Sequence, residues 1–111
     1  MKDRVMPQAI VITCSCPSHE EAVAIARMLL EQRLIACAQL NAPARSLYWW
    51  QGVIQDESEV IVVMKSLAPL YARIEQAILA CHSYQVPEIV AWPLTMVSPS
   101  YLAWLAEVVD A

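Results

Sequence analysis

The sequence predicts an α+β fold in which helices cover one face of an antiparallel sheet. On both sides of the only glycine, Gly52, the residues are β-branched or aromatic over runs longer than an average strand. Two segments that begin near Ser18 and Pro69 carry apolar residues at helical spacing. Apolar, strand-like segments alternate with these helices, and such an order of elements is typical of mixed domains.

The first predicted elements are a buried strand over residues 8–15 and a helix that runs to about Gln32. The run Ala-Ile-Val-Ile shows no alternation of apolar and polar residues, which indicates a central or covered strand. Pro17 ends this strand. Ser18 and Glu21 then form a capping box, in which the serine hydroxyl accepts from an orphan amide and the carboxylate reaches back to the helix start.

A second strand is predicted over residues 34–40. Pro43 interrupts it because proline has no amide proton to donate to a strand ladder. The chain then enters a long central hairpin over residues 46–66. Glycine reaches positive φ without a steric clash, so Gln51 and Gly52 are predicted to close a tight turn of the primed type.

The strands of this hairpin are longer than a small domain can bury. Polar residues at positions 55–59 interrupt the apolar run, so the tip is expected to project. A projecting two-stranded arm that carries the adjacent tryptophans Trp49 and Trp50 is marginal alone in water. We therefore expect the arm to pack on another copy of the chain.

The remainder of the chain predicts a helix, a strand and a further helix. Pro69 opens the second helix, which ends near His82, and residues 89–94 form the fourth strand. Ser98 caps a short C-terminal helix. The order β-α-β-β-α-β with an added helix is the ferredoxin-like split βαβ arrangement. We predict a single domain over residues 1–111.

Composition narrows the function classes. Apolar residues make up 59% of the chain, above the usual share of roughly 45–50%, and we interpret the surplus as subunit interface. No run approaches the roughly 20 residues that a membrane span requires, so no membrane association is expected. The net charge is −4 and the seven Lys and Arg residues are scattered, so nucleic acid is not an expected partner.

The N-terminal residues and the cysteines indicate the compartment. The first sixteen residues lack the pattern of a signal peptide, so a cytoplasmic location is expected. Four cysteines in such a chain are expected to be reduced thiols or metal ligands rather than disulfides.

Cysteine and histidine residues form the first candidate site. Cys14 and Cys16 point to the same face of a strand because side chains alternate with period two, and two thiols on one face suit a soft metal ion. Cys81 and His82 are adjacent at the end of the second helix. Neighbouring helical side chains diverge by about 100°, so any metal at this pair needs a ligand from elsewhere. The alternative is that these thiols are small buried hydrophobes.

A second candidate site consists of Lys65, Tyr84, Glu88 and Trp104. The end of the third strand is expected near the loop before the fourth, so Lys65 and Glu88 are candidates to pair beside an aromatic wall in a ligand cleft. The alternative is an ion pair that anchors the loop over a subunit seam. The sequence contains no Ser-His-Asp order, no suitable carboxylate pair and no glycine-rich phosphate loop, so an enzyme is not expected.

From about residue 9 to the C-terminus the chain resembles the CutA divalent-cation tolerance family. The most specific motifs are Ser-Leu-Tyr-Trp-Trp-Gln-Gly at residues 46–52 and Tyr-Gln-Val-Pro-Glu at residues 84–88. The resemblance implies a ferredoxin-like homotrimer whose long hairpin arms pack between subunits. It also implies a role in the tolerance of copper and other divalent cations.

The resemblance also implies a metal-ligand set. Copper binding in the family is linked to a cysteine at the end of the first strand and to two histidines before the Tyr-Gln-x-Pro-Glu motif. These positions correspond to Cys14, Cys81 and His82, so this chain offers a thiol where the family has an imidazole. A thiol shifts the preference toward softer ions such as Cu(I), with Zn(II) as another candidate.

An alternative function follows from the same resemblance. CutA proteins are similar in fold to the trimeric PII-type signal proteins, which bind small effectors in clefts between subunits. This implies a sensor or adaptor role that depends on Lys65, Tyr84 and Glu88 rather than on the thiols.

Overall fold

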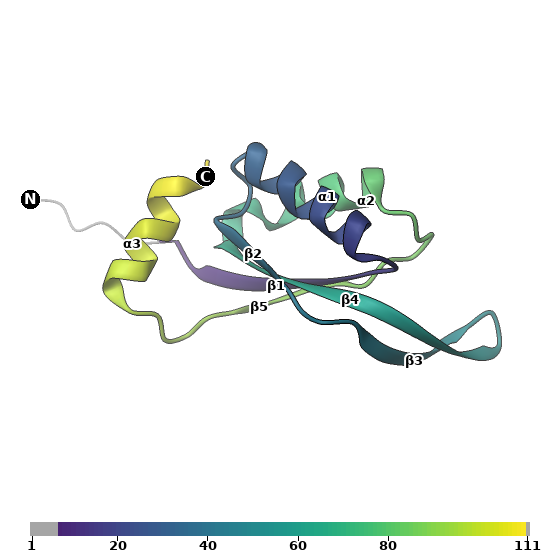
Figure 1. Ribbon diagram of the computed structural model, residues 1–111. Coiled ribbons are helices and arrows are strands. Elements are labelled where there is room, and N and C mark those ends of the chain that lie inside the picture. Colours follow the sequence, from purple (N-terminus) through teal and green to yellow (C-terminus); the bar gives the residue numbers. More distant parts are fainter. Residues whose placement is uncertain (1–6, 111) are drawn as a thin grey trace, which may run out of the picture.

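A computed structural model of the protein describes residues 7–110 (Figure 1). It confirms the predicted α+β, ferredoxin-like order with an added C-terminal helix. The elements in chain order are β1 (Ala9–Cys16), α1 (His19–Glu31), β2 (Cys37–Leu40), β3 (Ala44–Trp50), β4 (Val53–Leu67), a short 3₁₀ turn (Ala68–Leu70), α2 (Tyr71–Cys81), β5 (Ile89–Pro93) and α3 (Pro99–Val108).

Strand β4 connects the core of the molecule to a projecting arm. The core sheet has the order β2-β4-β1-β5 with every neighbouring pair antiparallel, and β3 pairs with the outer part of β4. The 15 residues of β4 span about 50 Å at ~3.3 Å per residue. The longest dimension of the molecule is 59 Å. The arm of β3 and outer β4 therefore extends well beyond the helices, as Figure 1 shows.

The hairpin turn at the tip of the arm has the predicted geometry. Trp50 pairs with Val53, and the two residues between them both have positive φ, with values of 50° for Gln51 and 77° for Gly52. Positive φ at both central residues defines a type I′ turn, whose twist matches the twist of the flanking strands.

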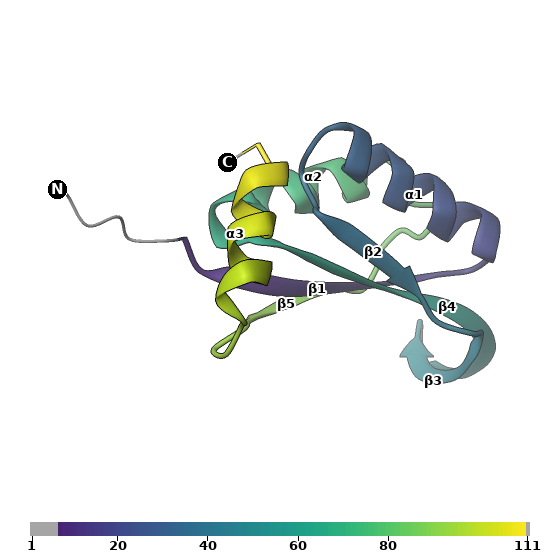
Figure 2. The same cartoon turned by 60° about the vertical axis from the view of Figure 1, so that its left-hand side comes forward.

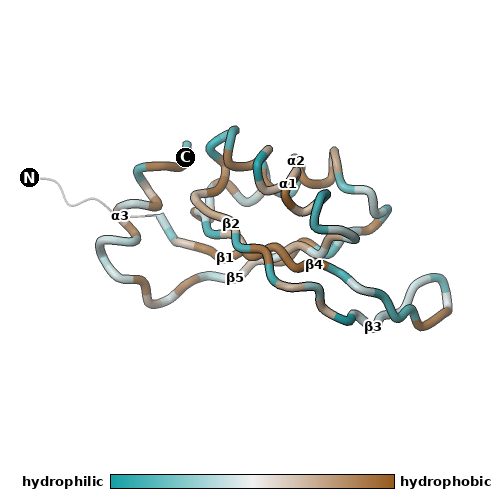
Figure 3. The backbone as a smooth tube through the Cα atoms, in the orientation of Figure 1, coloured by the Kyte–Doolittle hydropathy of each residue, from teal (hydrophilic) through white to brown (hydrophobic). Residues whose placement is uncertain are grey.

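The core lies between the sheet and helices α1 and α2, which cover one face of the sheet (Figure 1). Helix α3 lies at the end of the molecule opposite the arm, as the turned view in Figure 2 also shows. Hydrophobic residues concentrate in β1 and the inner half of β4, whereas the outer half of β4 is mostly hydrophilic until the tip (Figure 3). No helix of the described residues is long and apolar enough to cross a membrane.

The second strand is shorter than predicted. β2 begins at Cys37, whereas the sequence predicted strand from residue 34. Two residues after the end of helix α1, Arg33 adopts a φ of 59°, and the amide of Leu34 donates to the carbonyl of Leu29 at 3.0 Å. Leu34 and Ile35 are core residues of the helix exit, so their apolar character reflects burial rather than strand pairing.

The predicted capping box is only half formed. Ser18 Oγ accepts from the amide of Glu21 at 3.1 Å, as expected of an N-cap. The Glu21 carboxylate does not return to the helix start: it accepts from the amide and the hydroxyl of Ser83, each at 3.0 Å. Glu21 thus makes a tertiary contact in place of the capping contact, and this contact anchors the segment after α2, which also carries His82.

Candidate functional site

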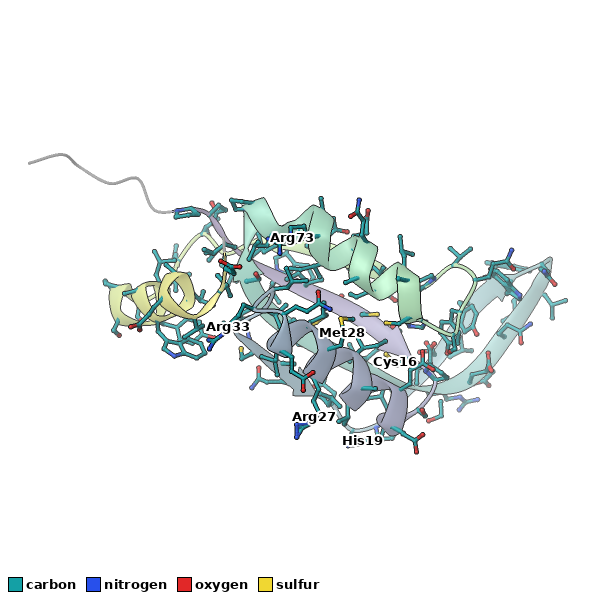
Figure 4. All side chains as sticks on the ribbon, turned by 90° about the horizontal axis from the view of Figure 1, so that it is seen from above. Cys16, His19, Arg27, Met28, Arg33 and Arg73 are labelled. Atoms are coloured by element: carbon teal, nitrogen blue, oxygen red, sulfur yellow. The ribbon has the colours of Figure 1, made fainter. Side chains whose placement is uncertain are left out.

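Two sulfur atoms and an imidazole meet at the end of β1 that faces the arm. The ligand atoms of Cys14, Cys16 and His82 all lie within 4.8 Å of one another. The two cysteines project from the helix-covered face of β1, and Figure 4 shows Cys16 between α1 and α2. His82 is the first residue after α2, and its extended backbone, with φ of −71° and ψ of 140°, turns the chain back toward β1. We call this group the thiol pocket.

Hydrogen bonds fix the tautomer of His82. The amide of Tyr84 donates to Nδ1 at 3.0 Å, so Nδ1 carries no proton. Nε2 lies 2.8 Å from the carbonyl oxygen of Ser15 and therefore donates its proton there. A Glu21 carboxylate oxygen lies 3.4 Å from Nδ1. The imidazole side chain has 0% solvent exposure, so a neutral ring with both nitrogens in contact with protein closes the pocket.

The two thiols influence each other. Cys14 and Cys16 both have 0% exposure. A hydrogen bond to Cys16, together with burial and the neighbouring negative charges, raises the pKa of Cys14 well above its ordinary value. The same hydrogen bond lowers the pKa of Cys16, although burial opposes this. The two thiols therefore titrate as a pair in which Cys16 is the more acidic.

Cys81 lies outside the thiol pocket. Its side chain is exposed, and its sulfur donates to the carbonyls of Ala77 and Ile78 one turn back along α2, at 3.4 and 3.6 Å. The sequence-based set of Cys14, Cys81 and His82 thus differs from the geometric group at one position. Cys81 is still helical, and its sulfur bonds back to carbonyls of its own helix, whereas the chain has already left the helix at His82.

A groove lies on the opposite face of the same end of β1, between the arm and the loop after α2. Its volume is about 590 Å³. We call it the arm groove. Its lining consists of Ser15, Ser46, Leu47, Tyr48, Trp50, Gln55, Glu57, Glu59, Ser83, Tyr84, Gln85, Val86 and Glu88.

Each carboxylate of the arm groove accepts a hydroxyl hydrogen bond. Tyr84 donates to Glu59 at 2.6 Å, and Ser15 donates to Glu88 at 3.1 Å. Tyr48 donates to Glu57.

The phenols respond to the carboxylates around them. The hydrogen bond to Glu57 raises the pKa of Tyr48 to about 12. Burial and the Glu59 carboxylate raise the pKa of Tyr84 further. Both phenols stay protonated at neutral pH and remain donors.

The four residues of the second sequence-predicted site do not converge within one chain. Tyr84 and Glu88 line the arm groove, but Lys65 and Trp104 do not. Lys65 pairs in register with Val11 of β1 and directs its amine to Gln39 Oε1 at 3.3 Å.

The predicted pair of Lys65 and Glu88 is therefore wrong within the chain. Glu88 bonds Ser15, which lies four residues along β1 from Val11, or about 13 Å at the rise of a strand. Trp104 stacks against Tyr101 with ring centroids 5.5 Å apart, on α3 at the far end of the molecule (Figure 2).

Sequence reasoning missed the acidic lining of the arm groove. Glu57 and Glu59 alternate along β4, so they share a face, and Tyr48 on β3 pairs with Gln55 on that same face. This alternation is visible in the sequence. The convergence of these residues with Tyr84 and Glu88 is not, because it depends on the path of the loop after α2.

Comparisons with known proteins agree on one family. The family model described as CutA1 divalent ion tolerance protein matches residues 10–108. The chain is 36% identical to the divalent-cation tolerance protein CutA of Citrobacter koseri over 94% of this chain and 90% of that protein. It is similar to the structure of the periplasmic divalent cation tolerance protein CutA from Archaeoglobus fulgidus, with a TM-score of 0.89, 34% identity, and coverage of 92% of this chain and 99% of that one.

Some relatives are longer than this chain. The protein CutA homolog of Danio rerio is 33% identical over 89% of this chain, and the match spans 66% of that relative's length.

Proposed function

The chain belongs to the CutA1 divalent ion tolerance protein family, and we propose that it serves cation tolerance by binding copper or a related soft metal ion in the thiol pocket. The observation that carries the proposal is the approach of two sulfur atoms and one imidazole to within 4.8 Å. Thiolate and imidazole ligands select Cu(I) and Zn(II) over hard cations such as Mg(II).

The donor set of the thiol pocket fits a soft ion. Three ligands from Cys14, Cys16 and His82 satisfy a three-coordinate site or leave one position open in a tetrahedral one. When Nε2 serves as the ligand, Nδ1 carries the ring proton and can no longer accept from the amide of Tyr84. Glu21, at 3.4 Å from Nδ1, is then placed to accept a hydrogen bond from it. A carboxylate behind a ligating histidine is the usual way to fix its orientation.

Metal entry requires a local rearrangement. In the structure Nε2 of His82 donates to the carbonyl of Ser15, and the imidazole has no exposure. A metal ion can reach the sulfur atoms only when this hydrogen bond breaks and the segment from His82 to Tyr84 moves outward. We therefore expect slow uptake, limited by the opening of this segment.

A chelator competition tests the site. Reduced protein is titrated with Cu(I) in the presence of a Cu(I) chelator, using the wild type and the single variants Cys14→Ser, Cys16→Ser and Cys81→Ser. We expect the first two variants to bind at least about 100-fold more weakly, since changes around metal ligands alone cost 10–100-fold. Cys81→Ser is the matched control and should bind like the wild type.

The result also distinguishes the two ligand sets. A loss in Cys81→Ser with no loss in Cys16→Ser would favour the set implied by family resemblance and contradict the geometric one. Equal affinity in all four proteins would exclude both sets. Circular dichroism of each variant checks that the fold is intact.

We propose that the assembly is a homotrimer in which the arms pack on neighbouring copies. The support is the apolar surface of the arm: Trp49 has 71% exposure, and Leu47, Val53 and Ile54 are also exposed. Light scattering should give three times the chain mass of 12.4 kDa. Trp49→Glu should dissociate the assembly, whereas the control Leu79→Glu, on the outer side of α2, should not. A monomeric wild type at micromolar concentration would contradict the proposal.

The proposal is for a binding protein in a reducing compartment, the cytoplasm, rather than for an enzyme. Its support is chemical, because the thiol pocket requires reduced cysteines to hold a metal ion. Cell fractionation combined with thiol labelling after unfolding in denaturant tests it. Recovery of the protein in an oxidising compartment with Cys14 and Cys16 blocked to labelling would contradict it.

A second candidate function is a sensor that binds a small effector in the arm groove. The supporting observation is the groove itself, whose volume of about 590 Å³ lies within the roughly 300–1,000 Å³ of small-molecule sites. Tyr84→Phe and Glu88→Gln should weaken effector binding and leave Cu(I) affinity unchanged.

A further inference from the structure

The arm groove carries negative charge that no cation within residues 7–110 offsets. Glu57, Glu59 and Glu88 line it, and the lining contains no lysine or arginine. Within residues 7–110, no basic side chain lies within 4.0 Å of these three carboxylates.

Glu59 is the most informative of the three carboxylates. It has 6% exposure, and its hydrogen-bonding side chain partner is the neutral hydroxyl of Tyr84. A buried carboxylate is costly unless a cation or several donors compensate it. Burial and the hydrogen bond to Glu59 raise the pKa of Tyr84, the hydrogen bond to Glu57 raises the pKa of Tyr48, and the neighbouring carboxylates add to both shifts.

The one basic residue of the arm, Arg45, forms its ion pair on the face of the arm opposite the groove. Arg45 forms a bidentate pair with Asp56, at 2.9 and 2.7 Å. Asp56 lies between Gln55 and Glu57 on β4, so its side chain points away from the groove. The excess of negative charge is therefore specific to the groove face.

Aromatic side chains form the walls around this charge. Tyr48 and Trp50 alternate along β3 and line the groove, and Tyr84 faces them from the loop after α2. The face of an aromatic ring attracts cations, and carboxylates between aromatic walls are the usual recognition elements for ammonium groups.

We propose that the arm groove binds a small organic cation that carries two or more primary ammonium groups. Glu57 and Glu59 are two residues apart on one strand, about 7 Å, so two ammonium groups on a short alkyl chain can each meet a carboxylate while the methylenes lie against Tyr48 and Trp50. The inference rests on the effector-binding candidate and is independent of the thiol pocket.

The same charges discriminate against other ligands. A nucleotide or another phosphate-bearing effector would bring its own negative charge to three carboxylates without a counter-cation. A hard metal ion would need several carboxylate oxygens around one point. The groove instead distributes its carboxylates, each with a hydroxyl donor from Tyr48, Tyr84 or Ser15.

The experiment uses putrescine, a diamine, with butanediol as its neutral counterpart. The full chain is titrated with each compound, and with ATP, by calorimetry and by amide chemical shifts. We expect putrescine to bind and to shift the amides of residues 55–59 and 83–88. Butanediol and ATP should not bind, and added salt should weaken the putrescine interaction.

Matched variants locate the site. Glu57→Gln and Glu59→Gln should each weaken putrescine binding by about tenfold, since a hydrogen bond to a charged group is lost. Asp56→Asn removes the same charge from the opposite face of the arm and should have no effect. Because Glu59 is buried, the exposed Glu57 keeps the test valid if Glu59→Gln fails to fold.

Three outcomes overturn the inference. Equal weakening by Asp56→Asn would show a nonspecific effect of net charge. Binding of ATP in place of putrescine would retain an effector site but reject its cationic ligand. Binding of none of the compounds would reject the inference, while the effector-binding candidate would still be tested with other ligands and the Cu(I) competition would still decide the metal site.

Discussion

The two faces of β1 at the arm end carry opposite chemistry. On the helix side, Cys14 and Cys16 meet His82 in a closed pocket without solvent exposure of the sulfur atoms or the imidazole. On the other side, Ser15 donates to Glu88 at the floor of an open, acidic and aromatic groove. Soft ligands lie on one face and hard ligands on the other, separated by the thickness of one strand.

The contrast shows how little sequence is needed to separate two kinds of site. Side chains alternate along a strand, so three consecutive residues contribute to two different environments. The segment after α2 completes both of them, because His82 turns toward the thiols and Tyr84 toward the groove. A change at either of these two residues will affect one site directly and the other through the shared segment.

The largest expected effect, on Cu(I) affinity, comes from moving the second thiol from one face of β1 to the other. The double variant Ser15→Cys with Cys16→Ser keeps the composition of β1 but places the second thiol in the arm groove. We expect its Cu(I) affinity, measured by chelator competition, to fall by at least about 100-fold, as in Cys16→Ser alone. Wild-type affinity in the double variant would show that the face of the strand does not matter.

A smaller effect is expected from loosening the segment that closes the pocket. Glu21→Gln weakens two hydrogen bonds from Ser83, so reaction of Cys14 and Cys16 with a thiol reagent should accelerate by about tenfold. Glu20→Gln is the matched control, since Glu20 lies in the same first turn of α1. Equal acceleration in both variants would assign the effect to the helix start rather than to the anchor.

The same anchor predicts a modest pH dependence of stability. Burial opposes ionisation of Glu21, but the hydrogen bonds from Ser83 outweigh it and lower the pKa of Glu21 below 4.5. The stabilisation is therefore complete above pH 4.5 and is lost as the pH falls through the lowered pKa. Urea unfolding should show wild type more stable than Glu21→Gln at pH 7, with the difference shrinking in acid. A difference that grows in acid would contradict this sign.

The smallest effect is expected on the outer face of the arm. Arg45 and Asp56 form an exposed pair within the chain, and such pairs add little to stability because water screens them. Asp56→Asn should leave the melting temperature within error of wild type. A clear drop would show that the neighbouring copies proposed to pack on Leu47 and Trp49, which share this face, also shield the pair from water.

The sequence predicted the elements that depend on local chemistry. The type I′ turn at Gln51 and Gly52 and the caps at Ser18 and Ser98 form as expected, because each rests on neighbouring residues. The exit from α1 does not, since Arg33 adopts positive φ and draws an apolar run out of the sheet.

The two sites were less predictable because they depend on strand register and on the path of the segment after α2. The sequence identified Cys14 and Cys16 as a pair on one face, yet the ligand set implied by resemblance took Cys81 in place of Cys16, and which of Cys81 and His82 reaches the pair depends on the residue at which α2 ends. It paired Lys65 with Glu88, but strand register places these residues apart. Register and loop direction are tertiary properties that residue patterns do not contain.

Titration of two ligands into two variants tests most directly whether the faces are independent sites. Cu(I), with a competing chelator, and putrescine are each titrated into Cys16→Ser and Glu59→Gln. The account predicts a crossed result: Cys16→Ser loses Cu(I) and keeps putrescine, whereas Glu59→Gln keeps Cu(I) and loses putrescine. Loss of both ligands in either correctly folded variant would contradict the separation of the two sites.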